Sequence, residues 1–145
     1  MALADDIFEA WGWKGLESAE VVAVNKFGNV IFTDQAGKYW RICPEELECK
    51  VIADSAVSYE RLLNDLEFKR DWEMTALVVV AEAKYGTQPV HRCFCLKMPS
   101  IFGGSYELEN IGTIRIGELI RFSGDVANQI KDLPPGSKVE LKIVD

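Results

Sequence analysis

Hydrophobic and polar positions at the start of the chain repeat with a helical period. The stretch "ADDIFEAWGW" (4–13) places Ile7, Phe8 and Trp11 on one side, and the aspartates before them suit a helix N-terminus. Gly12 and Gly15 end this pattern. We therefore expect an amphipathic helix in this stretch.

The pattern then changes to short extended runs. Apolar residues alternate around 22–24, resume at 30–33 and resume again at 39–43, and the polar segments between these runs contain glycine. Such runs joined by short turns predict a three-stranded antiparallel meander. A further strand is expected in "CKVIAD" (49–54).

Helical spacing returns after the meander. Ser55 or Ser58 can cap a helix in "YERLLNDLEF" (59–68). The positions expected to face inward are Leu62, Leu63 and Leu66. Residues 71–86 are ambiguous, because three consecutive valines favour a strand whereas the flanking Glu, Met, Ala and Lys favour a helix. We interpret them as a helix that ends at Gly86.

The remainder of the chain mixes both periods. Residues 90–98 alternate like a strand, 116–133 have helical spacing, and "KVELKIVD" (138–145) alternates as a closing strand. The inward positions expected in the long helix are Ile116, Leu119, Ile120, Phe122, Val126 and Ile130. Strands that cluster early, followed by helices, predict an α+β fold with an antiparallel sheet packed against several helices. At 145 residues, we expect one compact domain over 1–145.

The charge of −7 at pH 7 is unevenly spread. Residues 1–72 contain 14 acidic and 8 basic side chains, whereas residues 73–145 contain 9 and 8. An acidic surface repels the phosphate backbone, so we expect a basic protein partner rather than direct nucleic-acid binding. No apolar run approaches the length of a membrane span, and the N-terminus lacks the positive charge of a secretion signal. These features predict a cytoplasmic protein that does not bind membranes and has reduced cysteines.

One candidate metal site lies in "HRCFC". If this segment is a strand, His91, Cys93 and Cys95 share a face, and Cys43 or Cys49 supplies a fourth zinc ligand. The alternative is core packing, since reduced cysteine is among the most buried residue types and the paired Cys-x₂-Cys turns of structural zinc are missing. We expect no metal, and we keep a zinc-binding regulatory protein as an alternative function.

Catalytic motifs are also missing from the sequence. Clustered glutamates in "PEELE" (44–48) resemble paired carboxylates for acid–base work but are typical of a solvated surface. The chain has no Gly-x-Ser-x-Gly, no His-Glu-x-x-His and no P-loop. We therefore expect no enzyme activity, no catalytic residues and no cofactor, with a small structural interaction module or a small enzyme as alternatives.

Paired glycines in "SIFGGSYELENIG" (100–112) raise the question of a phosphate-binding loop. Such a loop leads into a helix N-terminus, whereas this one leads into the strand-like run 106–108 and carries glutamates. Gly103 and Gly104 are therefore predicted to form a turn with positive φ between two extended segments.

The run from 102 to the end of the chain resembles the C-terminal domain of bacterial type VI secretion immunity proteins. The matching features are a Gly-Gly turn at Gly103 and Gly104, then Asn110, the helix 116–130 and "DLPPGSKVELKIVD", and the resemblance is strongest over about 90–145. Several members of that family protect against DNases. The resemblance implies a protein that binds and neutralises a co-encoded effector toxin, with a cytoplasm-acting nuclease as the leading candidate.

A nuclease has a basic cleft, and an acidic inhibitor matches that charge. The charge imbalance between the two halves places the expected partner-binding surface in the acidic N-terminal half. The candidate residues are Glu45, Glu46, Glu48, Asp54, Glu60, Asp65, Glu67 and Asp71.

Overall fold

The computed structural model describes residues 2–134, 136 and 137. Its larger sheet is a four-stranded antiparallel meander in which the strands lie in chain order. The strands are β1 (Glu20–Val24), β2 (Val30–Thr33), β3 (Tyr39–Cys43) and β4 (Glu48–Ala53). The predicted three-stranded meander is confirmed, and the further strand predicted in 49–54 is β4, which pairs with β3.

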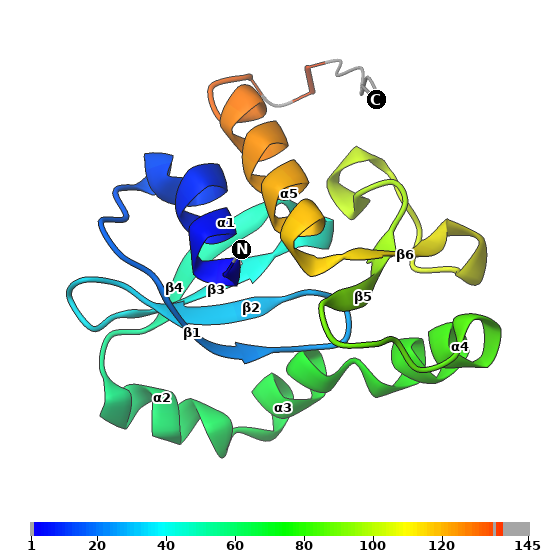
Figure 1. The fold of residues 1–145 in the computed structure, drawn as a ribbon, viewed down its shortest axis with the longest axis horizontal. Helices are drawn as coiled ribbons and strands as arrows, with labels where there is room; N and C mark the ends of the chain where they lie inside the picture. The colour runs from blue at the N-terminus through cyan, green and yellow to red at the C-terminus, as the bar shows by residue number, and fades with distance from the viewer. Residues whose placement is uncertain (1, 135, 138–145) are drawn as a thin grey trace.

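Helices cover both faces of this sheet (Figure 1). On one face lie α1 (Leu3–Trp11) and α5 (Ile116–Ile130), and on the other lie α2 (Ala56–Leu63) and α3 (Leu66–Glu73). Alternation along β2 explains the two layers, since successive side chains of a strand point to opposite faces. Val30 and Phe32 belong to the core that contains α1 and α5, whereas Ile31 packs with Tyr59 on the face covered by α2 and α3.

A close contact fixes α1 against α5. Gly124 lies so near α1 that a Cβ atom at this position would be 2.4 Å from the Ala10 carbonyl oxygen. The absence of a side chain therefore lets the two backbones approach. Around this contact Ile7, Trp11 and Ile120 are almost completely buried.

A second, smaller sheet pairs β5 (Arg92–Leu96) with β6 (Ile111–Arg115). Helix α4 (Thr75–Tyr85) packs on this hairpin, and the Tyr85 hydroxyl donates a hydrogen bond to the Ile111 carbonyl at 2.8 Å. The Phe94 amide donates to the Lys26 carbonyl at 2.9 Å, which attaches β5 to the turn between β1 and β2.

These elements confirm the α+β class with an antiparallel sheet. The helix expected over 71–86 is present as α4 and ends before Gly86 as predicted, but its first residues, 71–73, belong to α3, and Met74 with φ of +48° separates the two helices. The helical prediction for 116–133 corresponds to α5. Ser55 is the N-cap of α2, where its hydroxyl accepts a hydrogen bond from the Ser58 amide. The predicted strand 138–145 lies outside the described residues. Among the helices that are described, none is long and apolar enough to cross a membrane.

The helix predicted over 59–68 is in fact divided between α2 and α3. The chain breaks at Asn64 and Asp65, and Asp65 caps α3 by accepting a hydrogen bond from the Phe68 amide at 3.1 Å. Because the helix is interrupted, its regular spacing does not continue across the break and the single inward face does not form. Leu63 and Leu66 are 41% and 66% exposed, which contradicts their predicted inward positions.

The strand-like interpretation of 106–108 is wrong. A 3₁₀ turn covers Leu108–Asn110, and the Asn110 side chain accepts from the Met98 amide and donates to the Met98 carbonyl, at 2.9 and 3.0 Å. A side chain thus replaces the partner strand. The predicted glycine turn is present, but of the two glycines only Gly103 has the expected positive φ. Gly103 has φ of +90°, whereas a Cβ atom on Gly104 would lie 1.8 Å from the Met98 carbonyl oxygen.

The predicted orientations of three other side chains, those of His91, Phe8 and Phe122, are wrong. His91 precedes β5, has φ of +76° and is exposed, so it does not share an alternating face with Cys93 and Cys95. Phe8 and Phe122 are 48% and 39% exposed, because α1 and α5 turn these positions away from their common contact.

Candidate functional site: an acidic groove

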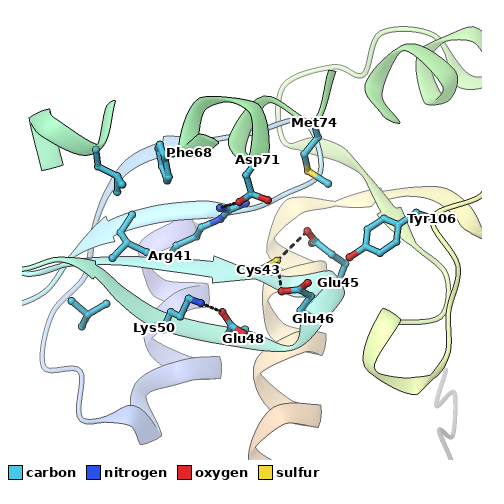
Figure 2. A pocket seen from close by; sticks show the side chains of 13 residues that line it. Arg41, Cys43, Glu45, Glu46, Glu48, Lys50, Phe68, Asp71, Met74 and Tyr106 are labelled. Atoms are coloured by element: carbon cyan, nitrogen blue, oxygen red, sulfur yellow. Dashed lines mark hydrogen bonds and ion pairs between the residues drawn. The ribbon is translucent and has the colours of Figure 1, made fainter. Parts of the chain in front are cut away.

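A groove of about 490 Å³ opens between the sheet and the helical layer formed by α2 and α3 (Figure 2). Its floor comes from β3, β4 and the 3₁₀ turn Pro44–Glu46 between them, and Phe68 and Asp71 of α3 line one side. Met74 and Tyr106 close the end toward the smaller sheet. Four carboxylates and two basic side chains line it, so its lining carries a net negative charge.

The Pro44–Glu46 turn directs its two glutamates to different environments. Proline favours the first position of the turn, and Leu47 ends it with φ of +50°. Glu45 is only 7% exposed, whereas Glu46 faces solvent. The Asn29 side-chain amide donates to both carboxylate oxygens of Glu45, at 3.2 and 3.0 Å. These bonds satisfy a buried charge that would otherwise be costly.

Arg41 connects this buried network to α3. Its guanidinium donates to the Asn29 side-chain oxygen from Nε at 3.1 Å and from Nη2 at 2.8 Å. The same group forms an ion pair with Asp71 and lies over the Trp72 ring, 5.3 Å from its centroid. One side chain of β3 therefore contacts two consecutive residues of α3 beside the groove.

The groove also contains a thiol and a phenol. Cys43 Sγ lies 3.0 Å from Glu45 Oε1, and burial together with this carboxylate strongly raises the pKa of the thiol. The thiol therefore stays protonated and donates to Glu45. Burial also raises the pKa of Tyr106, and Glu45 and Glu46 add to the effect. The carboxylates thus act directly on the phenol that faces them in Figure 2.

The other cysteines are also poor nucleophiles. Burial raises the pKa of Cys49 and of Cys93 to about 12 and raises that of Cys95. A thiol is reactive as its thiolate, so none of these groups is activated for catalysis at neutral pH. Within the described part of the chain, no three His, Cys, Asp or Glu side chains gather in a group that could hold a metal ion.

A second cavity, of about 750 Å³, lies where the N-terminal ends of α1 and α5 meet the smaller sheet. Its lining includes Arg92, Arg115 and Arg121, but Arg121 Nε is bound by Asp6 Oδ1 at 2.6 Å. This ion pair joins α5 to α1.

Comparison with known proteins identifies the family. The sequence model of the family described as T6SS immunity protein Tdi1, C-terminal, matches residues 53–127, about half of the chain. The chain belongs to this family of type VI secretion immunity proteins. No curated protein matches it. The resemblance stated from the sequence is confirmed, but the matched segment both begins and ends earlier than the region 90–145 on which it was based, and residues 132–145 lie outside it.

The matched segment of the immunity protein contains α2, α3, α4, the smaller sheet and all of α5 except its last three residues. The larger sheet lies before it, with β4 ending at Ala53. The groove is therefore formed jointly by the matched segment and by the part of the chain before it. Its floor precedes the matched segment, and the side chains of Phe68, Asp71, Met74 and Tyr106 belong to that segment.

The structure brings together four of the eight predicted partner-binding residues of the immunity protein. Glu45, Glu46, Glu48 and Asp71 all line the groove. Glu45 is buried inside the network, and the Glu48 carboxylate pairs with Lys50 Nζ at 2.8 Å.

The other four candidates lie outside the groove. Asp54 accepts a hydrogen bond from the Ser58 hydroxyl at 2.9 Å, and Asp65 caps α3. Glu60 and Glu67 are exposed on α2 and α3. The helical layer formed by α2 and α3 therefore presents carboxylates to solvent.

Sequence reasoning missed Asn29, Arg41 and Tyr106 of the immunity protein. Asn29 lies at the end of a glycine-containing turn and looks like an ordinary turn residue, yet it is 0% exposed. Arg41 interrupts the alternation of β3 with a charge on the face that α3 covers, which was the one available signal. Tyr106 was assigned to a strand and was not connected with the glutamates of residues 45–48.

Proposed function

We propose that this immunity protein binds and neutralises a cognate effector toxin that acts in the cytoplasm as a nuclease. The family match over residues 53–127 is the observation that supports binding to an effector. The acidic groove and the carboxylates of α2 and α3 support a basic partner, since the cleft of a nuclease must attract phosphates.

The protein acts by binding rather than by catalysis. The raised pKa values of its buried thiols argue against a cysteine nucleophile. Residues 1–145 act as one immunity-type domain, because α5 of the matched segment packs on α1, and α3 is held by Arg41 of β3. Such a partner is co-encoded with its inhibitor, and the complex contains one copy of each.

Co-expression with the product of the neighbouring gene tests this function. The effector alone should stop growth, and the immunity protein should restore growth and co-purify with the effector. A nanomolar dissociation constant, equivalent to about −12 kcal/mol, is within reach of an interface of standard size. A nuclease is tested by incubating the effector with plasmid DNA and with RNA, with and without the immunity protein. Degradation that the immunity protein does not stop would contradict the proposal, and so would a lack of binding.

A further inference from the structure

Two of the four carboxylates that line the groove, Glu45 and Glu46, form no ion pair among the described residues, and of these two Glu46 alone is exposed. Asp71 is paired with Arg41, Glu48 is paired with Lys50, and buried Glu45 is bound by the Asn29 amide. Glu46 is exposed, and its carboxylate lies 3.8 Å from the Cys43 sulfur, whose single proton is already donated to Glu45. The carboxylate of the groove that is neither buried nor paired is therefore that of Glu46.

An aromatic ring lies beside this carboxylate. Tyr106 is 44% exposed and closes the end of the groove next to Glu45 and Glu46 (Figure 2). Met74 lines the same end from the other side. A cation is attracted to the face of an aromatic ring, and a nearby carboxylate strengthens that attraction. Ring and carboxylate together form a site for a cationic side chain.

The guanidinium of arginine fits this combination better than the ammonium of lysine. It is planar, stacks on aromatic rings and forms two parallel hydrogen bonds with a carboxylate. The groove is open to solvent and has a volume in the range of pockets that hold small-molecule groups. The molecule itself shows the same kind of interaction on the opposite side of the groove, where Arg41 lies over Trp72 and pairs with Asp71.

We propose that the groove accepts an arginine side chain of the effector, with its guanidinium over the Tyr106 ring and paired with Glu46. This inference rests on the proposed function, in which the partner is a basic protein. Removal of the Glu46 charge loses a charge-assisted pair, and we expect the dissociation constant for the effector to rise about tenfold or more.

The first measurement does not need the effector. Acetyl-arginine amide is titrated into the ¹⁵N-labelled full chain, and neutral acetyl-citrulline amide, which has nearly the same shape, is titrated in parallel. We expect saturable shifts of the amide signals of Glu46 and Tyr106 with the arginine compound alone. The Glu46→Gln variant should lose these shifts. Tyr106→Leu should weaken them, and Tyr106→Phe should keep them because the ring remains.

The second measurement uses the effector and a matched control. Glu118→Gln removes the same charge from an exposed position of α5, which covers the opposite face of the larger sheet from the groove, and it should change the dissociation constant by no more than about twofold. If Glu46→Gln binds the effector as tightly as the wild type, or if arginine produces no saturable shift, the arginine site is refuted. The proposed function is judged separately, by whether the wild-type protein binds the effector and restores growth.

Discussion

Replacement of Arg41 by alanine should destabilise the protein far more than an ordinary surface substitution. Arg41 is the donor to the side-chain oxygen of Asn29, a residue that is 0% exposed, and its own side chain is 11% exposed. Loss of the donor leaves a buried acceptor unsatisfied, and loss of the contact with Trp72 removes a cation–π interaction. Together these changes should lower the free energy of unfolding by about 2–4 kcal/mol.

The ion pair with Asp71 should contribute little to this loss. The Asp71 side chain is 69% exposed, and exposed pairs contribute about 1 kcal/mol or less. Asp71→Asn is therefore expected to cost much less than Arg41→Ala. Arg61→Ala is the matched control, because Arg61 is exposed on α2, and it should stay within about 0.5 kcal/mol of the wild type.

Equilibrium unfolding in urea, followed by tryptophan fluorescence and by circular dichroism, measures these differences. Urea is preferred because guanidinium chloride would screen the ion pair. The dependence of the free energy on urea should be unchanged, as expected when a variant alters stability without altering the surface exposed on unfolding. An Arg41→Ala variant as stable as Arg61→Ala would refute the structural role of the buried network. Equal losses for Arg41→Ala and Asp71→Asn would assign the effect to the exposed pair instead.

Three further predictions concern packing, pH and charge. Gly124→Ala should cost about 1–3 kcal/mol through its clash with the Ala10 carbonyl, whereas Gly12→Ala, with nothing within 4 Å of the new Cβ, should not lower the melting temperature. Folding raises the pKa of the Cys49 and Cys93 thiols from 9.0 to about 12, so above pH 9 these thiols keep their protons in the folded protein and lose them in the unfolded chain. The urea midpoint should therefore fall as the pH rises from 9 to 12. A double alanine variant at these two positions should flatten that fall, and an unchanged slope would contradict the assignment. Neutralisation of three exposed carboxylates should slow association with the effector at low salt and reduce its salt dependence, and unchanged kinetics would exclude this surface. The three substitutions are Asp54→Asn, Glu60→Gln and Glu67→Gln.

Hydrophobic periodicity alone predicted the elements in which burial follows the regular spacing of a strand or a helix. Val30, Ile31 and Phe32 alternate between two covered faces, and the run 116–130 has a clear helical period, so both were recognised. The prediction failed where side chains replace backbone partners. Asp65 starts a new helix in the middle of a helical pattern, and Asn110 bonds the backbone of Met98 in place of a neighbouring strand.

The sequence located only part of the candidate site, because some of its contacts join residues that are far apart in the chain. The count of acidic residues directed attention to 45–48 and to Asp71, which do meet in the groove. The count could not show that Glu45 points inward, because its partner Asn29 lies 16 residues earlier. Nor could it place Tyr106 against the same glutamates, since that contact depends on how the segment after β5 returns to the larger sheet.

The shared construction of the groove has a consequence for how such proteins diversify. Arg41, Glu46 and Glu48 precede residue 53, whereas Asp71 and Tyr106 lie within the segment that defines the family. Substitution on either side of this boundary alters the same surface. Two lineages that inherit the same family segment would therefore come to recognise different toxins when mutation or recombination changes only the sheet that precedes it.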